Sequence, residues 1–218
     1  MSNTEGFIEE VTEEVRRDRL YGLLRRYGWI AAVAVLAIVG GAAWVEWQRA
    51  TARAAAEGRG DAMLDALAAE DPAAALGALS EAGPAEPLRL LLLAAQQEAT
   101  GDAAAARASL EAVAALPGAD PLYADLARLK ALMLAGDMDP AERLAGLEAL
   151  SLPGAPFRMP ALEQMALVQV EAGDLAAARE TLVAILEDAA LSPGMRARAE
   201  ALTEAIGPAG DGVPPSGP

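Results

Sequence analysis

Carboxylates are the most numerous side chains of this chain that can do chemistry. The 218 residues include 32 Asp and Glu but neither His nor Cys. The sequence therefore excludes a Cys nucleophile, a Ser-His-Asp triad, imidazole acid/base catalysis and a zinc site with the usual His and Cys ligands. A carboxylate metal site, or hydrolysis by a pair of carboxylates, stays open.

The carboxylate clusters themselves favour structural roles. Asp137 and Asp139 lie two residues apart but lack the Gly and the later Glu of an EF-hand loop, so we interpret them as turn and cap residues. The acids at positions 9, 10, 13 and 14 are typical of a solvated helix face. We expect no enzyme activity, cofactor, metal or small-molecule substrate, with a carboxylate-dependent hydrolase as the remote alternative.

One apolar segment stands out among the elements that would position these side chains. Residues 27–47 form an apolar run that is uncharged from position 29 to position 45, with Trp29 near its start, Trp44 and Trp47 at its end, and Arg25 and Arg26 just before it. A helix of this length is about 30 Å long, close to the thickness of the hydrocarbon core of a bilayer. We predict a transmembrane anchor; the alternatives are a cleaved signal peptide and a buried core helix.

The positions of the basic residues predict the orientation of that anchor. Five arginines precede the run, whereas only Arg49, Arg53 and Arg59 follow it closely. The positive-inside rule then places the N-terminus in the cytoplasm and the bulk of the chain, from about residue 48, on the far side of the membrane. Within the anchor, Ala37 and Gly41 form a small-xxx-small pair that could contact another membrane helix.

The chain beyond the anchor is strongly acidic. The whole sequence has 17 basic and 32 acidic residues; removing the 5 basic and 6 acidic residues of positions 1–45 leaves 12 and 26, a net charge of −14. Such a charge repels the phosphates of nucleic acids, so we exclude a nucleic-acid partner.

A short turn motif recurs along this acidic region. A Gly or Glu precedes an Asp and an Ala-rich helical segment four times, and the Asp residues are spaced by 31, 35 and 37 residues; the turn residues are Asp71, Gly101, Asp102, Gly136, Asp137, Gly173 and Asp174. The spacing brackets the 34-residue period of tetratricopeptide repeats. Gly would end one helix and Asp would cap the next. The alternative is an Ala-rich bundle whose turns are similar by chance.

These observations predict an all-α chain with a transmembrane helix followed by a degenerate solenoid of tetratricopeptide-like repeats. The expected parts are a cytoplasmic amphipathic helix (1–26), the anchor (27–47), a helical stalk interrupted near Gly58 and Gly60 (48–69), the repeat domain (70–206) and a disordered Pro/Gly tail (207–218). Polar residues expected on the concave, protein-binding side of the first helices are Arg89, Gln96, Arg128, Lys130 and Gln164.

The layout resembles a known bacterial family. The resemblance rests on four features: the acidic and basic segment from Phe7 to Leu20, the motif from Arg26 to Trp29, the single span, and the degenerate repeats that end in Gly173 to Arg179. They are similar to the YfgM-like family of ancillary subunits of the SecYEG translocon. The resemblance implies a single-pass protein of the bacterial inner membrane with a cytoplasmic N-terminus and a periplasmic repeat domain. It also implies a non-enzymatic adaptor that links the translocon to periplasmic chaperones. The alternative is an envelope scaffold for another complex, such as cell-wall or division machinery.

Overall fold

The computed structural model describes residues 3–79, 83–189 and 191–207. Within these ranges the chain is all-helical and has no strand, as the sequence predicts. The helices in chain order are α1 (Asn3–Leu67), α2 (Pro72–Ala78), α3 (Glu86–Ala99), α4 (Ala103–Ala115), α5 (Pro121–Leu134), α6 (Pro140–Leu150), α7 (Arg158–Glu171), α8 (Leu175–Leu186) and α9 (Pro193–Ile206). The predicted tail lies outside the described residues from position 208 onward.

Helix α1 makes up nearly all of the first of two compact units, Met1–Asp61. Its section Arg25–Leu67 contains a stretch that is long and apolar enough, by length and composition, to cross a membrane. None of that stretch is buried inside the protein. The predicted break near Gly58 and Gly60 is wrong, because α1 continues through both. A glycine costs a helix about 1 kcal/mol relative to Ala, and the alanine-rich flanks offset this cost.

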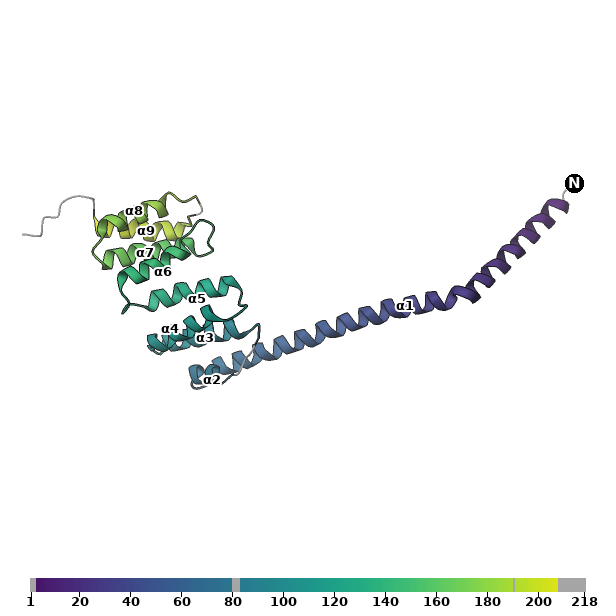
Figure 1. Cartoon of the computed structure of the whole chain (residues 1–218), viewed down its shortest axis with the longest axis horizontal. Helices are drawn as coiled ribbons and strands as arrows, with labels where there is room; N and C mark the ends of the chain where they lie inside the picture. The colour runs from purple at the N-terminus through teal and green to yellow at the C-terminus, as the bar shows by residue number, and fades with distance from the viewer. Residues whose placement is uncertain (1–2, 80–82, 190, 208–218) are drawn as a thin grey trace, which may run out of the picture. The chain divides into compact units, whose positions relative to one another are not determined.

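The second unit spans Ala62–Pro218 and therefore starts earlier than the predicted boundary at residue 70. The last turns of α1 belong to it, since the side chains of Met63 and Ala66 are buried. Each later helix from α2 to α9 packs against the next one along the chain, and Figure 1 shows these helices side by side. Helices α3, α5, α7 and α9 begin at residues 86, 121, 158 and 193, which are 35, 37 and 35 residues apart.

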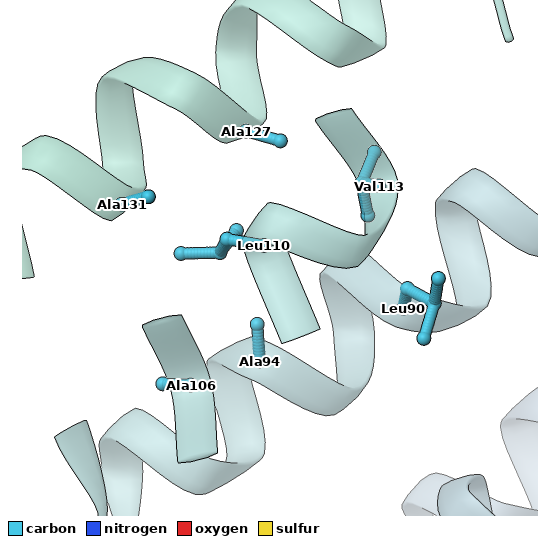
Figure 2. Packing of buried hydrophobic residues seen from close by; sticks show 7 residues of the cluster. All are labelled: Leu90, Ala94, Ala106, Leu110, Val113, Ala127 and Ala131. Atoms are coloured by element: carbon cyan, nitrogen blue, oxygen red, sulfur yellow. The ribbon is translucent and has the colours of Figure 1, made fainter. Parts of the chain in front are cut away.

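Three clusters of buried side chains hold the second unit together. The first joins α3, α4 and α5, the second joins α5, α6 and α7, and the third joins α7, α8 and α9. In the first cluster, Leu110 of α4 lies between Ala94 of α3 and the two alanines of α5, Ala127 and Ala131 (Figure 2). Alanine buries little apolar area, but it lets neighbouring helix backbones approach closely.

Alanines supply much of the buried surface of α3 and α5. Leu88, Leu122 and Met133 are exposed, whereas Leu90 and Leu129 are buried together with four alanines: Ala94, Ala124, Ala127 and Ala131. Since the buried positions hold small residues, large apolar side chains remain at the surface of both helices. On α4 and α6 the large apolar side chains of Leu110, Val113, Leu147 and Leu150 are buried.

Candidate protein-binding surface

The turns α3–α4 and α7–α8 have the same geometry. The N–H of Asp102 donates to the carbonyl of Gln97 (2.9 Å) and that of Gly101 to Glu98 (3.0 Å), which is the Schellman pattern. The Asp102 carboxylate in turn accepts from the N–H of Ala105 (3.0 Å) and caps α4. One Asp therefore ends the first helix with its backbone and starts the second with its side chain.

The second copy of this turn lies 72 residues later. Asp174 donates to the carbonyl of Gln169 (2.9 Å) and accepts from the N–H of Ala177 (3.0 Å). Gly101 and Gly173 have φ values of +83° and +79°, the left-handed conformation that glycine adopts without strain. These turns agree with the prediction from the sequence, and Asp71 also caps its helix, α2, through the N–H of Ala74 (2.9 Å).

A side-chain hydrogen bond that was not predicted from the sequence joins the two helices within each of these pairs. The hydroxyl of Ser109 donates to the side-chain oxygen of Gln97 (2.7 Å), and the hydroxyl of Thr181 donates to that of Gln169 (2.8 Å). Each donor lies 12 residues after its acceptor. The signal in the sequence was a Gln five positions before the capping Asp and a hydroxyl residue seven positions after it.

The turn between α5 and α6 differs, and the predicted role of Asp137 as the cap is wrong. The N-cap of α6 is Asp139, whose carboxylate accepts from the N–H of Ala141 (2.8 Å). Pro140, at the first position of α6, favours the start of the helix there and so moves the cap to residue 139. Asp137 instead accepts from Arg107 (2.7 Å), and Gly136 does not have a positive φ.

In each of the pairs α3–α4, α5–α6 and α7–α8, an arginine on the second helix bonds near the end of the helix that follows the pair. Arg107 on α4 pairs with Asp137 beyond α5, and Arg143 on α6 pairs with Glu171 at the end of α7 (2.6 Å). Arg179 on α8 donates to the carbonyls of Ile206 and Gly207 at the end of α9 (both 3.1 Å). These three arginines, spaced by 36 residues, link successive helix pairs.

The polar residues predicted for partner binding fall into different environments. Arg89 is buried, which corrects the expectation of an exposed contact residue: it forms two bonds to Glu86 (2.6 and 2.9 Å) and donates to the carbonyl of Leu76 (2.8 Å), so that it joins α3 to α2. The remaining candidates are Arg128, exposed and paired with Asp125 (2.9 Å), Lys130, paired with Glu98 (3.7 Å), and the half-buried Gln96 and Gln164.

An apolar pocket opens between α4, α5 and α6. Its volume is about 230 Å³, and its apolar wall consists of Ala114, Ala131, Leu132, Met138 and the Cα of Gly146. Arg107, Glu111 and Arg128 complete the lining. The pocket thus combines an apolar interior with charged side chains of both signs.

A larger and more polar cavity lies at another edge of the second unit. It measures about 580 Å³ and is lined by residues around the start of α3 and the turn before α5, including Pro117 and Tyr123. Within the described residues, no group of three or more Asp and Glu residues is placed to hold a metal ion. Elsewhere, a hydrogen bond from Arg198 to Glu163 (2.5 Å), together with the attraction between their charges, raises the pKa of the arginine above its ordinary value.

The anchor residues of α1 lie on an exposed helix surface. Trp29, Trp44 and Trp47 are exposed, and the rings of the last two are 5.2 Å apart. Arg26 lies over the ring of Tyr27 at 5.8 Å, and Arg25 is exposed. A Cβ added at Gly41 would meet nothing within 4 Å, and Ala37, one helical turn away, is also exposed. This arrangement suits a helix whose surroundings are lipid or another helix.

Comparison with models of known protein families, with curated protein sequences and with solved structures finds no match to this chain.

Proposed function

We propose that this protein is a non-enzymatic adaptor, held in a membrane by residues 27–47, whose second unit is a degenerate tetratricopeptide-like solenoid that binds protein partners. The observation that carries the proposal is the repeated turn at Asp102 and Asp174, within helix pairs that recur every 35 to 37 residues. Arrays of helix pairs present extended surfaces that commonly serve protein recognition.

The apolar section of α1 supports the anchoring part of the proposal. An exposed apolar helix of this length is costly in water, because its surface remains hydrated unless lipid or protein covers it. The basic residues before the span favour a cytoplasmic N-terminus and a periplasmic second unit.

The resemblance to the YfgM-like family supplies the partners. We propose that the protein associates with the SecYEG translocon and that its second unit contacts periplasmic chaperones. The acidic character of the region after residue 45, with 12 basic and 26 acidic residues, favours partners with basic or mixed-charge surfaces.

Crosslinking in intact membranes tests this function. The tagged full chain is crosslinked, purified and analysed by mass spectrometry, next to a control in which residues 1–61 carry an unrelated soluble domain. We expect translocon subunits and chaperones with the full chain, and loss of the chaperones with the control. Recovery of cell-wall or division proteins without translocon subunits would support the scaffold alternative instead. A periplasmic reporter fused after residue 218 should be active if the orientation is right.

A further inference from the structure

The two helices of the middle pair, α5 and α6, pack less closely than any other two consecutive helices from α2 to α9. The helices of the outer pairs, α3–α4 and α7–α8, approach each other far more closely. Helix α5 instead packs on α4, which precedes it in the chain, and α6 packs on α7, which follows it. The second unit thus consists of two halves, from Ala62 to Leu134 and from Pro140 to Ile206, which meet at α5 and α6.

The residue at one buried position accounts for the looser packing of α5 on α6. Four residues after the capping Asp, α4 and α8 have Ala106 and Ala178, both fully buried, whereas α6 has Arg143. The distance between packed helices depends on the size of the side chains at their contact. The arginine side chain is only 8% exposed and extends to Glu171 at the end of α7, so it occupies space inside the protein that alanine leaves to a neighbouring helix.

The hydrogen bonds that fix the outer pairs are also missing from the described residues of the middle pair. The positions that correspond to the glutamine and the hydroxyl residue hold Leu134 and Gly146, whose side chains cannot form the bond. In place of the Schellman pattern, the N–H of Met138 donates to the carbonyl of Ala135 (3.0 Å), and Gly136 does not have a positive φ. The turn from residue 135 to residue 139 therefore lacks both restraints that set the angle between the helices of the outer pairs.

Apolar contacts hold the two halves together instead. Leu129 of α5 is buried in the cluster that α5 shares with α6 and α7, and Leu132 lies against Gly146, where an added Cβ would be 2.9 Å from its nearest methyl carbon. Apolar contacts are non-directional, so they persist when one helix turns slightly against another. The ion pair from Arg107 to Asp137 adds little restraint, because the aspartate side chain is 74% exposed.

We propose that the turn of residues 135–139 is a hinge about which the two halves of the second unit change their relative angle. The inference goes beyond the proposed adaptor function and does not depend on it. Helices that keep their own packing move as rigid bodies, and a short connecting segment absorbs the change in backbone dihedral angles. A partner that contacts both halves would bind best at one angle and shift the population towards it.

Distances between pairs of spin labels, measured by double electron–electron resonance, test the hinge. The sequence has no cysteine, so nitroxides attach only to cysteines that are introduced into the full chain, which is reconstituted at one copy per nanodisc. The pair Ala95→Cys and Ala145→Cys spans the hinge from α3 to α6, whereas the pair Ala145→Cys and Ala205→Cys lies within the second half, from α6 to α9. All these alanines are exposed.

The widths of the two distance distributions decide the proposal. We expect the distribution across the hinge to be at least about twice as wide as the distribution within the second half, because only the first reports the change in angle. Equal widths would overturn the hinge. The measurement needs no partner, so absence of translocon subunits and chaperones from the crosslinked material would contradict the adaptor function and leave the hinge standing.

A variant at position 143 tests the packing argument. Arg143→Ala introduces the residue of the outer pairs, and Glu148→Gln, which changes an exposed side chain of the same helix, is the matched control. We expect Arg143→Ala to narrow the distribution across the hinge to about the width within the second half, and the control to change neither distribution. A distribution that stays wide in folded Arg143→Ala would contradict the packing argument. Circular dichroism verifies folding, and if Arg143→Ala unfolds, the two label pairs in the chain with Arg143 still decide the hinge.

Discussion

Arg143 on α6 donates to the carboxylate of Glu171 at the end of α7 over 2.6 Å, although the two side chains differ greatly in exposure. The arginine side chain is 8% exposed and the glutamate side chain 57%. The Nε of Arg143 is buried and has no hydrogen-bond partner among the described residues. The corresponding position, four after the capping Asp, holds the fully buried Ala106 in α4 and Ala178 in α8.

This asymmetry predicts different effects for the two partners of the pair. Glu171→Gln removes the counter-charge of a buried cation and should lower the free energy of unfolding by about 1–3 kcal/mol. Arg143→Met replaces that cation with an apolar side chain of similar length and should change stability by less than about 1 kcal/mol in either direction. Urea denaturation followed by circular dichroism measures both. A greater loss in Arg143→Met than in Glu171→Gln would contradict the prediction.

The helix caps predict how four Asp→Ala variants rank in stability. Asp102→Ala, Asp139→Ala and Asp174→Ala each remove an acceptor for an N–H at the start of a helix, so each should destabilise the protein by about 1 kcal/mol. Asp137→Ala is the matched control, because it removes only an ion pair in which the aspartate is largely exposed, and it should cost clearly less than Asp139→Ala. Thermal unfolding of the four variants under one set of conditions gives the comparison.

Local chemistry predicted some of these features, and tertiary contacts decided the others. The turns at Asp102 and Asp174 followed from the residues themselves, because a glycine and a capping carboxylate act within one turn of chain. The cap of α6 was also local, but Pro140 outweighed the spacing that pointed to Asp137.

The buried faces of α3 and α5 could not be predicted from local sequence, because tertiary contacts decide them. Hydrophobic periodicity favours leucines over alanines, yet alanines fill the core wherever neighbouring helices come close, as at Ala94 and Ala127. The burial of Arg89 likewise depends on a carbonyl 13 residues away, which no local pattern shows.

The turn glycines offer a third test. Gly173→Ala places a Cβ on a residue with φ of +79°, and should lower the free energy of unfolding by about 1–2 kcal/mol. Gly136 occupies the corresponding turn after α5 without a positive φ, and an added Cβ there would meet nothing within 4 Å. Gly136→Ala should therefore be neutral or slightly stabilising. Equal destabilisation by the two substitutions in chemical denaturation would show that the turns do not differ as described.

The tryptophans allow a direct test of the anchor. The sequence has three, Trp29, Trp44 and Trp47, and all lie on α1 near the two ends of the apolar run, so that the tryptophan fluorescence reports on this segment alone. Tryptophan favours the boundary between headgroups and hydrocarbon. In reconstituted vesicles, lipids brominated near the headgroup should therefore quench the emission more strongly than lipids brominated near the chain ends. Trp29→Phe separates the two ends, because the remaining pair, 5.2 Å apart, reports on one boundary only. Strong quenching by a water-soluble quencher together with weak quenching by both lipids would place the helix outside the bilayer.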